Sequence, residues 1–351
     1  MNDKEYNTRL SEAITWLRFP LIFLIIMLHC YSVQRLEGSH ETYFKVLYPF
    51  YNWLGETGVP GFFFISGYLF FHSKKNYAQK LKTRIHTLLI PYLVWNTLLV
   101  LFYIISYAVG HPQVIYGRSL ENYDFIDYLR LYWDRGAFDN GNFVPLLCPL
   151  WYIRNLFIMC VLSPLLYYII RYARELFLIL VAIWWLTTYH NAFIPQTILF
   201  FSLGAYFSIH DINPLEFVYK HRNFFLTAFG FFALADLASH LSSGTPINLQ
   251  LHRMALVFNI SILLLFADYC SRHCYTNEKL SNAAFIVFCV HYPIVVLIRK
   301  YSISKYANVP DWIHILLYFA CVIIATILSI GVYILLERYF SKTKKILSGN
   351  R

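Results

Sequence analysis

Ten long runs of apolar residues dominate this chain of 351 residues. A helix needs about 20 predominantly apolar residues to cross the hydrocarbon core of a bilayer, and most of the runs approach that length. The runs lie at residues 14–34, 44–71, 85–109, 146–170, 175–190, 194–210, 223–241, 252–270, 282–299 and 312–336. Apolar residues make up 58% of the chain and charged residues only 14%, which excludes a water-soluble globule. We therefore predict an all-α fold, a polytopic transmembrane helical bundle with about ten spans, as a single domain over residues 1–351.

The distribution of basic residues predicts the orientation of this bundle. If the N-terminus is cytoplasmic, the inner segments hold more Lys and Arg than the outer segments, as the positive-inside rule requires. Both termini then lie in the cytoplasm, and residues 337–351 form a short basic tail at the lipid surface. The formal net charge of +10 then reflects topology, so we expect the lipid bilayer and no nucleic acid as a partner.

The seven cysteines predict neither a disulfide framework nor a metal site. Most of them lie inside apolar runs, where cysteine behaves as a small hydrophobic residue. Cys270, His273 and Cys274 lie close together, but no second cluster supplies the remaining ligands of a zinc site. We therefore expect no metal.

The largest external loop is expected at about residues 110–145. Its acidic residues stand among Tyr, Trp and Arg side chains and are Glu121, Asp124, Asp127, Asp134 and Asp139. Loops of this length are often functional. These side chains could contact a hydroxyl-rich acceptor such as a sugar, or they could form an ordinary solvated loop, and the sequence leaves both interpretations open.

Two ionisable residues, Arg18 and His29, lie inside the first apolar run. Such residues cost about 2.5–3.5 kcal/mol each on insertion scales, so they are candidates for function. They are 11 residues apart, which is three helical turns plus ~20°, so both project from one face and are separated by ~16 Å along the axis. Each also has a structural interpretation: Arg18 could extend to the inner headgroups, and His29 could be a hydrogen-bonded packing residue.

The same spacing matches a family motif. Arg18 followed by ten residues and His29 resembles the R/K-X10-H motif of the acyltransferase-3 family of integral membrane acyltransferases. Further segments resemble that family in the same order along the chain, at residues 59–69, 82–92, 149–156, 289–293 and 337–338. The family often carries a second Arg three residues after the position of Arg84, which is absent here, and Lys82 or His86 can substitute for it. We expect no fused periplasmic hydrolase-like domain.

The resemblance implies the reaction, the cofactor and the partners. Members of the family transfer an acyl group, usually acetyl, from cytoplasmic acyl-CoA to a hydroxyl of a cell-envelope glycan or lipid-linked saccharide. The implied location is the inner (cytoplasmic) membrane. Arg18, Lys82 and Arg84 lie on the inner side of the predicted topology and are the expected ligands of the CoA phosphates. His29, with Arg18, is the expected catalytic residue, either as the general base or as a covalently acylated histidine.

The developing oxyanion also needs hydrogen-bond donors, and the substrate needs binding groups. The candidates for these roles are Glu56, Ser66, Trp151, Arg154, Asn155, His291 and Glu337. Structural alternatives exist for most of them. Ser66 and Gly67 could form a close-packing notch, and Trp151 could belong to the interfacial aromatic belt. Glu337 could pair with Arg338 or another basic residue, while Glu56 is a candidate partner of His29.

Two other classes of function are compatible with about ten membrane spans that contain buried charges. A transporter or flippase of a glycolipid or polysaccharide would have no acyl-transfer activity, and transporters frequently show internal repeats, which are not visible here. A purely structural assembly protein would not need Arg18 and His29 on one face of a helix. An integral membrane O-acyltransferase is therefore the predicted function.

Overall fold

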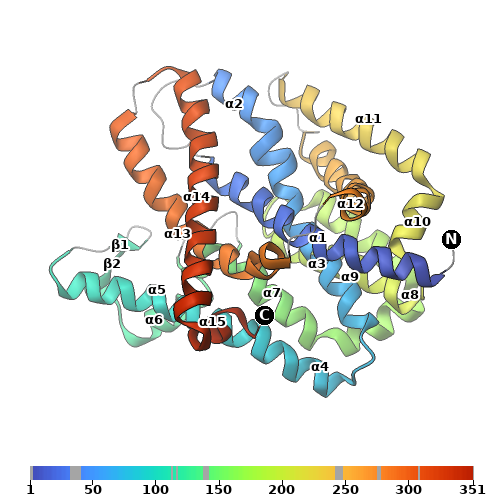
Figure 1. Ribbon diagram of the computed structural model, residues 1–351, viewed down its shortest axis with the longest axis horizontal. Coiled ribbons are helices and arrows are strands. Elements are labelled where there is room, and N and C mark those ends of the chain that lie inside the picture. The colour runs from blue at the N-terminus through green and yellow to red at the C-terminus, as the bar shows by residue number, and fades with distance from the viewer. Residues whose placement is uncertain are drawn as a thin grey trace.

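The computed structural model is almost entirely helical (Figure 1). It describes residues 3–31, 41–111, 114–115, 118–136, 142–241, 248–274, 278–306 and 309–350. The α-helices are α1 (Asp3–Cys30), α2 (Glu41–Tyr48), α3 (Gly58–His72), α4 (Tyr77–Arg84), α5 (Ile90–Ala108), α6 (Phe125–Arg130), α7 (Trp151–Val161), α8 (Ser163–Thr187), α9 (Phe193–Ile209), α10 (Pro214–Lys220), α11 (Arg222–Leu241), α12 (Asn248–His273), α13 (Glu278–Tyr306), α14 (Asp311–Tyr339) and α15 (Ser341–Ser348). Short π- and 3-10 segments are η2 (Pro49–Leu54), η3 (Gly55–Thr57), η4 (Ile85–Leu89), η5 (Leu120–Asn122) and η6 (Cys148–Leu150). The expected all-α bundle is confirmed.

Fewer helices are suited to cross a membrane than the ten apolar runs suggested. Among the described residues, six helical segments are long and apolar enough to cross a membrane. They are Glu5–Cys30, Tyr77–Ala108, Arg222–Leu241, Asn248–His273, Glu278–Tyr301 and Asp311–Tyr339. These six become eight if two bent pairs each count as one span. The pairs are Cys148–Val161 with Ser163–Thr187, bent by 70°, and Phe193–Ile209 with Pro214–Lys220, bent by 91°.

The difference arises where the apolar runs contain breaks. The run 146–170 is interrupted after Val161, because Pro164 cannot continue the hydrogen bonding of a preceding helix and instead occupies the first turn of α8. The expected boundary between the runs 146–170 and 175–190 coincides with Arg174, whose φ of 48° kinks α8. The run 44–71 is divided among α2, η2, η3 and α3.

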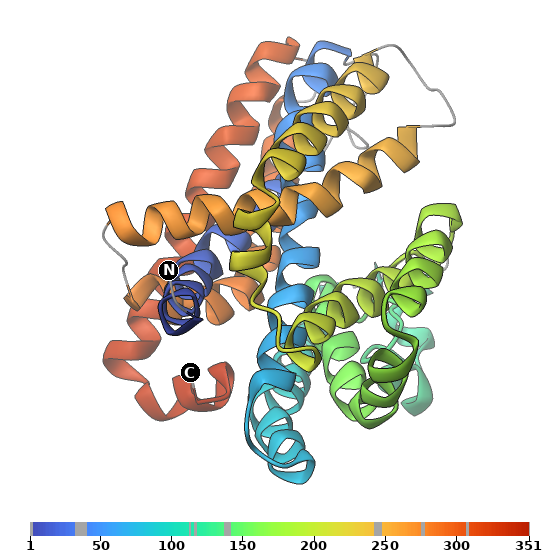
Figure 2. The same ribbon diagram turned by 90° about the vertical axis from the view of Figure 1, so that its right-hand side faces the viewer.

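Helix α1 lies in the centre of the bundle and packs against α3, α12, α13 and α14 (Figures 1 and 2). Its residues Leu10, Ile14, Leu17, Leu21 and Ile25 recur at helical spacing and are all buried. In Figure 2 the green helices α8 and α9 lie on the opposite side of the molecule from the red helix α14. The central position of α1 means that residues along its length contact several later helices.

Helices α3 and α9 cross at two glycines. A Cβ atom added to Gly67 would lie 2.0 Å from the carbonyl oxygen of Phe201, and one added to Gly204 would lie 2.0 Å from that of Phe64. Small residues permit such close approach of helix backbones in membranes. The interpretation of the Ser66–Gly67 step as a close-packing notch is therefore confirmed for Gly67.

The expected external loop is a folded segment. It contains strands β1 (Val114–Ile115) and β2 (Arg118–Ser119), which pair antiparallel, followed by η5 and α6. A small core joins the segment to α5 and consists of Val100, Ile115, Leu120, Leu131 and Leu146. Asn96 of α5, itself buried, accepts a hydrogen bond from the backbone N–H of Leu147 at 3.2 Å and thereby satisfies a donor beside η6.

The C-terminal residues fold onto the helical bundle. The sequence predicts instead a basic tail that lies only at the lipid surface. Helix α15 packs against α5, where Trp95 donates a hydrogen bond from Nε1 to the carbonyl oxygen of Leu347 at 3.0 Å. Leu347 and Ser348 are buried. Burial of Leu347 explains why the segment docks despite its three lysines, Lys342, Lys344 and Lys345.

Candidate active site

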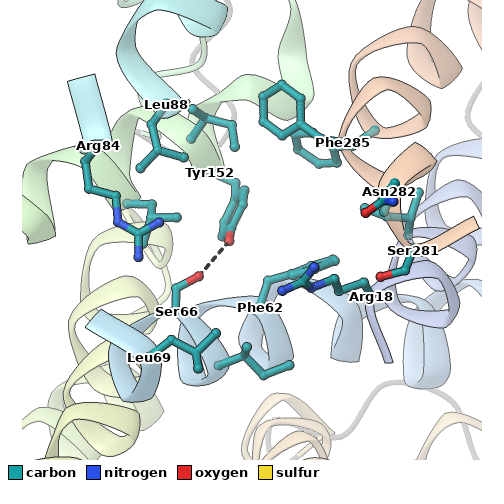
Figure 3. A pocket seen from close by; sticks show the side chains of 16 residues that line it. Arg18, Phe62, Ser66, Leu69, Arg84, Leu88, Tyr152, Ser281, Asn282 and Phe285 are labelled. Carbon is teal, nitrogen blue, oxygen red and sulfur yellow. Dashed lines mark hydrogen bonds between the residues drawn. The ribbon is translucent and has the colours of Figure 1, made fainter. Parts of the chain in front are cut away.

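A cavity of about 330 Å³ lies among α1, α3, α7 and α13, with α4 and η4 at one side (Figure 3). Its polar lining residues are Arg18, Ser66, Arg84, Tyr152, Ser281 and Asn282. Its apolar lining residues are Ile22, Phe62, Ile65, Leu69, Leu88, Ile153, Leu156, Ala284, Phe285 and Phe288. The structure therefore brings three residues of the predicted site, Arg18, Ser66 and Arg84, to one cavity from three different helices.

The two arginines face each other across this cavity. Figure 3 shows the side chains of Arg18 and Arg84 entering from opposite walls, with Tyr152 and Ser66 between them. Within the described part of the chain, neither guanidinium pairs with a carboxylate. Arg84 lies over the ring of Phe70, with Cζ 5.8 Å from the ring centroid. Two unpaired guanidinium groups make the cavity suited to an anionic ligand such as a phosphate.

Three further polar groups complete the cavity wall. Tyr152 OH lies 3.4 Å from Ser66 Oγ (Figure 3). Ser281 Oγ is buried, and no hydrogen-bond partner for it exists among the described residues. An unsatisfied buried hydroxyl in a cavity wall is available to a ligand. Nothing in the sequence marks Ser281 and Asn282, because they are small polar residues at the start of an apolar run.

His29 lies farther along α1 and packs against α13. Its ring centroid is 5.4 Å from that of His291 and 5.1 Å from that of Tyr292. Arg299, also on α13, donates a hydrogen bond to the carbonyl oxygen of His29 at 3.0 Å. Arg18 lines the cavity on the same side as Ser281 and Asn282 of this helix (Figure 3). Both motif residues therefore face α13, in agreement with the 11-residue spacing, and α1 and α13 run in the same direction.

An aromatic side chain of the cavity wall, Phe288, lies near the histidine that contacts His29. His29 does not line the cavity, whereas Phe288 does, and the Phe288 ring is 6.0 Å from His291 and 5.8 Å from Tyr152. His291 is fully buried, and its Nδ1 lies 3.2 Å from the carbonyl oxygen of Val287. If Nδ1 donates there, Nε2 is a free acceptor, and no partner for Nε2 exists among the described residues.

Three predicted residues of α7 do not line the cavity. Trp151 stacks on Phe193 with ring centroids 3.9 Å apart. Arg154 donates hydrogen bonds to the carbonyl oxygens of Trp133 and Phe143, both at 2.8 Å. Asn155 accepts hydrogen bonds from Arg154 at 3.0 and 3.1 Å and reaches Thr197 at 3.3 Å. These side chains attach the folded external segment and α9 to α7.

The remaining predicted residues, Glu337, Glu56 and Lys82, also lie outside the cavity lining. Glu337 pairs with Lys344 at 2.9 Å, so a basic partner is confirmed for this carboxylate. Glu56 pairs with His252 at 3.1 Å, and within the described residues it forms no hydrogen bond or ion pair with His29. Lys82 is exposed and does not line the cavity.

The acidic residues of the external segment are partly paired. Arg118 donates a hydrogen bond to Asp127 at 2.7 Å and holds the pKa of that carboxyl below its ordinary value. Asp134 lies 3.9 Å from Arg130. Asp139 lies outside the described residues. Where side chains are described, no group of three or more His, Cys, Asp or Glu residues is arranged to hold a metal ion.

These features define a multi-pass membrane protein with a cavity lined by two arginines, and with a contacting pair of histidines, His29 and the buried His291, farther along α1. Residues 11–334 match the family described as "Acyltransferase domain". The chain therefore belongs to this acyltransferase family, which confirms the resemblance drawn from its motifs, and it is an acyltransferase. It is similar to the succinoglycan biosynthesis protein ExoH of Rhizobium meliloti (strain 1021), with 28% identity over 373 residues that cover 98% of this chain and 94% of the relative. No solved structure matches the chain.

Proposed function

We propose that this enzyme transfers an acyl group, acetyl in the simplest case, from cytoplasmic acyl-CoA to a hydroxyl of a cell-envelope saccharide or glycolipid. The observation that carries the proposal is the cavity in which Arg18 and Arg84 face each other, with no carboxylate partner among the described residues. An unpaired charge inside a membrane bundle is costly, so its presence favours an anionic ligand. The similarity to a succinoglycan biosynthesis protein supports a saccharide as the acceptor.

The donor would enter from the Arg18 end of the bundle. A cavity of about 330 Å³ is at the small end of the range of ligand pockets, so it suits the acyl-pantetheine arm better than the whole nucleotide. Arg18 and Arg84 would bind the pyrophosphate, and Ser281 and Asn282 would hydrogen-bond the amides of the arm. The adenine nucleotide would lie at the mouth of the cavity, near Lys82.

His29 would act as the general base beyond the cavity wall formed by Phe288. It takes the proton from the acceptor hydroxyl as that oxygen attacks the thioester carbonyl carbon. The tetrahedral oxyanion then collapses, the carbon–sulfur bond breaks, and the CoA thiolate leaves and takes the proton back from His29. The Phe288 ring, which lines the cavity and is 6.0 Å from the His291 ring, would turn aside for the thioester to reach His29. An acyl-histidine intermediate is the alternative role.

The orientation follows from the position of the donor site. Acyl-CoA is cytoplasmic, so the Arg18 end would face the cytoplasm, with both termini inside and the protein in the inner membrane. Residues 1–351 would act as one membrane domain, because α1, α3, α7 and α13 all contribute to the cavity.

The test uses an acceptor that the enzyme has not already modified. Polysaccharide extracted from a deletion strain is incubated with the purified protein and [14C]acetyl-CoA, and the label in the polysaccharide is counted. We expect label with the wild type, a loss of about 10²–10⁴-fold in rate with His29→Ala, and wild-type labelling with His190→Ala, an exposed histidine outside the site. Equal labelling by the wild type and His29→Ala would refute the role of His29. Saccharide flux across liposomes without acyl-CoA would support a transporter instead.

A further inference from the structure

A second polar cluster lies at the His29 end of α1, outside the cavity. It joins η3 to α11 and α12 through Glu56, His252 and Asp236. His252 Nε2 is 3.1 Å from Glu56 Oε2, and His252 Nδ1 is 3.0 Å from Asp236 Oδ2. Tyr48 of α2 donates a hydrogen bond to Asp236 Oδ1 at 2.9 Å. The imidazole of His252 thus lies between two carboxylates, and one of them, that of Asp236, also accepts a hydrogen bond from Tyr48.

The two ends of this cluster differ in exposure. The side chains of Asp236 and His252 are 0% and 6% exposed, whereas that of Glu56 is 42% exposed. Glu56 Oε2 faces His252, and among the described residues Oε1 has no hydrogen-bond partner. The network therefore holds one carboxylate in a fixed position and leaves its second oxygen open. A buried ion pair contributes little to stability, so stability alone is a weak reason for three ionisable groups in an apolar bundle.

The cluster is adjacent to the reactive histidine. A Cβ atom on Gly55 would lie 3.1 Å from Leu28 Cβ, so the residue before Glu56 touches the residue before His29. Two residues after His29, Tyr31 stacks on Tyr51 with ring centroids 3.5 Å apart. Tyr51 in turn contacts Tyr48 edge to face, with ring centroids 6.1 Å apart. A row of tyrosines thus connects the end of α1 to the clamped imidazole.

Such a surface has the chemistry that recognises a hydroxyl-rich ligand. A carboxylate accepts hydrogen bonds from hydroxyl groups, and charge-assisted bonds of this kind are the stronger ones. Tyrosine rings present an apolar face together with a hydroxyl, so they suit a molecule with both C–H faces and polar edges. A saccharide has both features, whereas the anionic nucleotide of the donor would be repelled by Glu56.

We propose that Glu56 binds the acceptor saccharide through its hydroxyl groups, and that His252 and Asp236 are positioning residues that hold Glu56 beside His29. The inference rests on the proposed function, which supplies the saccharide as acceptor. It assigns the acceptor to the end of α1 opposite the donor cavity. Glu56 is then a substrate-binding residue, while the proton transfer remains with His29.

The experiment measures the KM for the acceptor separately from donor binding. Polysaccharide from the deletion strain is varied at saturating [14C]acetyl-CoA, and CoA binding is measured by titration calorimetry. Glu56→Gln should raise the acceptor KM about 10- to 100-fold, which corresponds to the loss of a charged hydrogen bond, and leave the Kd of CoA unchanged. Asp236→Asn should raise the acceptor KM less, about 3- to 10-fold. Glu56 keeps its charge in this variant, but Asp236 no longer orients the His252 ring that positions it. Glu41→Gln is the matched control, since Glu41 pairs with Lys45 on α2 outside the network.

The outcomes separate this inference from the proposed function. If the wild type labels the polysaccharide but Glu56→Gln retains the wild-type acceptor KM, the acceptor site is wrong and the proposed function stands. A fall in kcat without a change in acceptor KM would also overturn it, as would a parallel loss of CoA binding. If the wild type labels no polysaccharide, the proposed function itself fails. Glu56→Ala, compared by its unfolding temperature with Glu56→Gln, shows whether any loss comes from misfolding.

Discussion

Arg18 and Arg84 differ from other ionisable side chains of the bundle in their surroundings. Arg9 pairs with the buried Asp268 at 2.5 Å, and Arg272 reaches the same carboxylate at 2.9 Å. Arg18 and Arg84 instead point into the cavity. Neither has a carboxylate partner in the part of the chain that the structure describes, so a ligand is the simplest explanation for their position.

Substitution of either arginine should weaken donor binding. Removal of a hydrogen bond to a charged group costs about 1.5–3 kcal/mol, so Arg18→Ala and Arg84→Ala should each raise the Kd of CoA roughly 10- to 150-fold. Lys82→Ala should have a smaller effect, because Lys82 is exposed and outside the cavity. Titration calorimetry with CoA checks this, with Arg130→Ala, an exposed residue of α6, as the control. Unchanged CoA affinity in both cavity variants would show that the cavity does not hold the donor phosphates.

The sequence predicts the position of a site residue where one helix decides it, and not where the packing of several helices decides it. The spacing of Arg18 and His29 predicts a shared face because helical periodicity alone decides it, and both residues do face α13. The partner of Glu56 is His252, which lies almost two hundred residues later on α12, and no local pattern relates the two. Ser281 enters the cavity wall for the same reason, since only the packing of α13 on α1 brings it there.

Among the described glycines, those of the α3–α9 crossing leave the least room for an added Cβ atom. Gly67→Ala would place a methyl group 2.0 Å from a backbone oxygen, so one helix would have to move. Overpacking of this kind costs typically 1–3 kcal/mol and more where the backbone must shift. We expect Gly67→Ala and Gly204→Ala to lower the unfolding temperature strongly or to abolish folding. The measurement is thermal unfolding of the detergent-solubilised protein.

Gly230 on α11 is the matched control for this crossing. A Cβ atom at Gly230 would meet no other atom of the described residues within 4 Å, so Gly230→Ala adds a methyl group without a clash with them. Helix propensity then favours alanine by up to about 1 kcal/mol, and we expect an unchanged or slightly raised unfolding temperature. Similar unfolding temperatures for Gly67→Ala and Gly230→Ala would mean that α3 and α9 do not approach as closely as described.

Long uninterrupted helices were predictable, and broken ones were not. The runs 252–270, 282–299 and 312–336 lie within α12, α13 and α14, because continuous apolar sequence without a break has few alternatives in a membrane. Residues from elsewhere in the chain form hydrogen bonds at both bends, of 70° and 91°. Tyr77 donates a hydrogen bond to the carbonyl oxygen of Val161 at the first bend, at 2.9 Å, and Asn213 at the second bend donates one to Asn7, also at 2.9 Å. Hydropathy cannot reveal such contacts.

In the whole molecule, α1 connects two sites of different chemistry. Its Arg18 end lines a cavity with unpaired positive charge, and its His29 end adjoins the clamped carboxylate of Glu56. A donor and an acceptor that approach from opposite ends would meet near His29. This arrangement predicts that the enzyme uses acyl-CoA from one side of the membrane only.

Sealed membrane vesicles test this sidedness, because a nucleotide with several phosphate charges does not cross a bilayer. With [14C]acetyl-CoA added outside, inverted vesicles that expose the cytoplasmic face should label the polysaccharide. Right-side-out vesicles should label it only after permeabilisation, and His29→Ala vesicles should not label it in either orientation. Labelling by intact right-side-out vesicles would place the donor site on the outer face and reverse the proposed orientation.

The chain carries its own probe for the same question. Cys274 is exposed and follows α12, close in sequence to Ser281 of the cavity wall, whereas Cys30, Cys160 and Cys289 are buried. A membrane-impermeant maleimide should therefore modify wild-type protein in intact inverted vesicles and much less in right-side-out ones. Cys274→Ser should remove this difference, which identifies the residue. Because the reaction does not depend on activity, equal modification in both orientations would contradict the topology even if the enzyme transferred no acyl group.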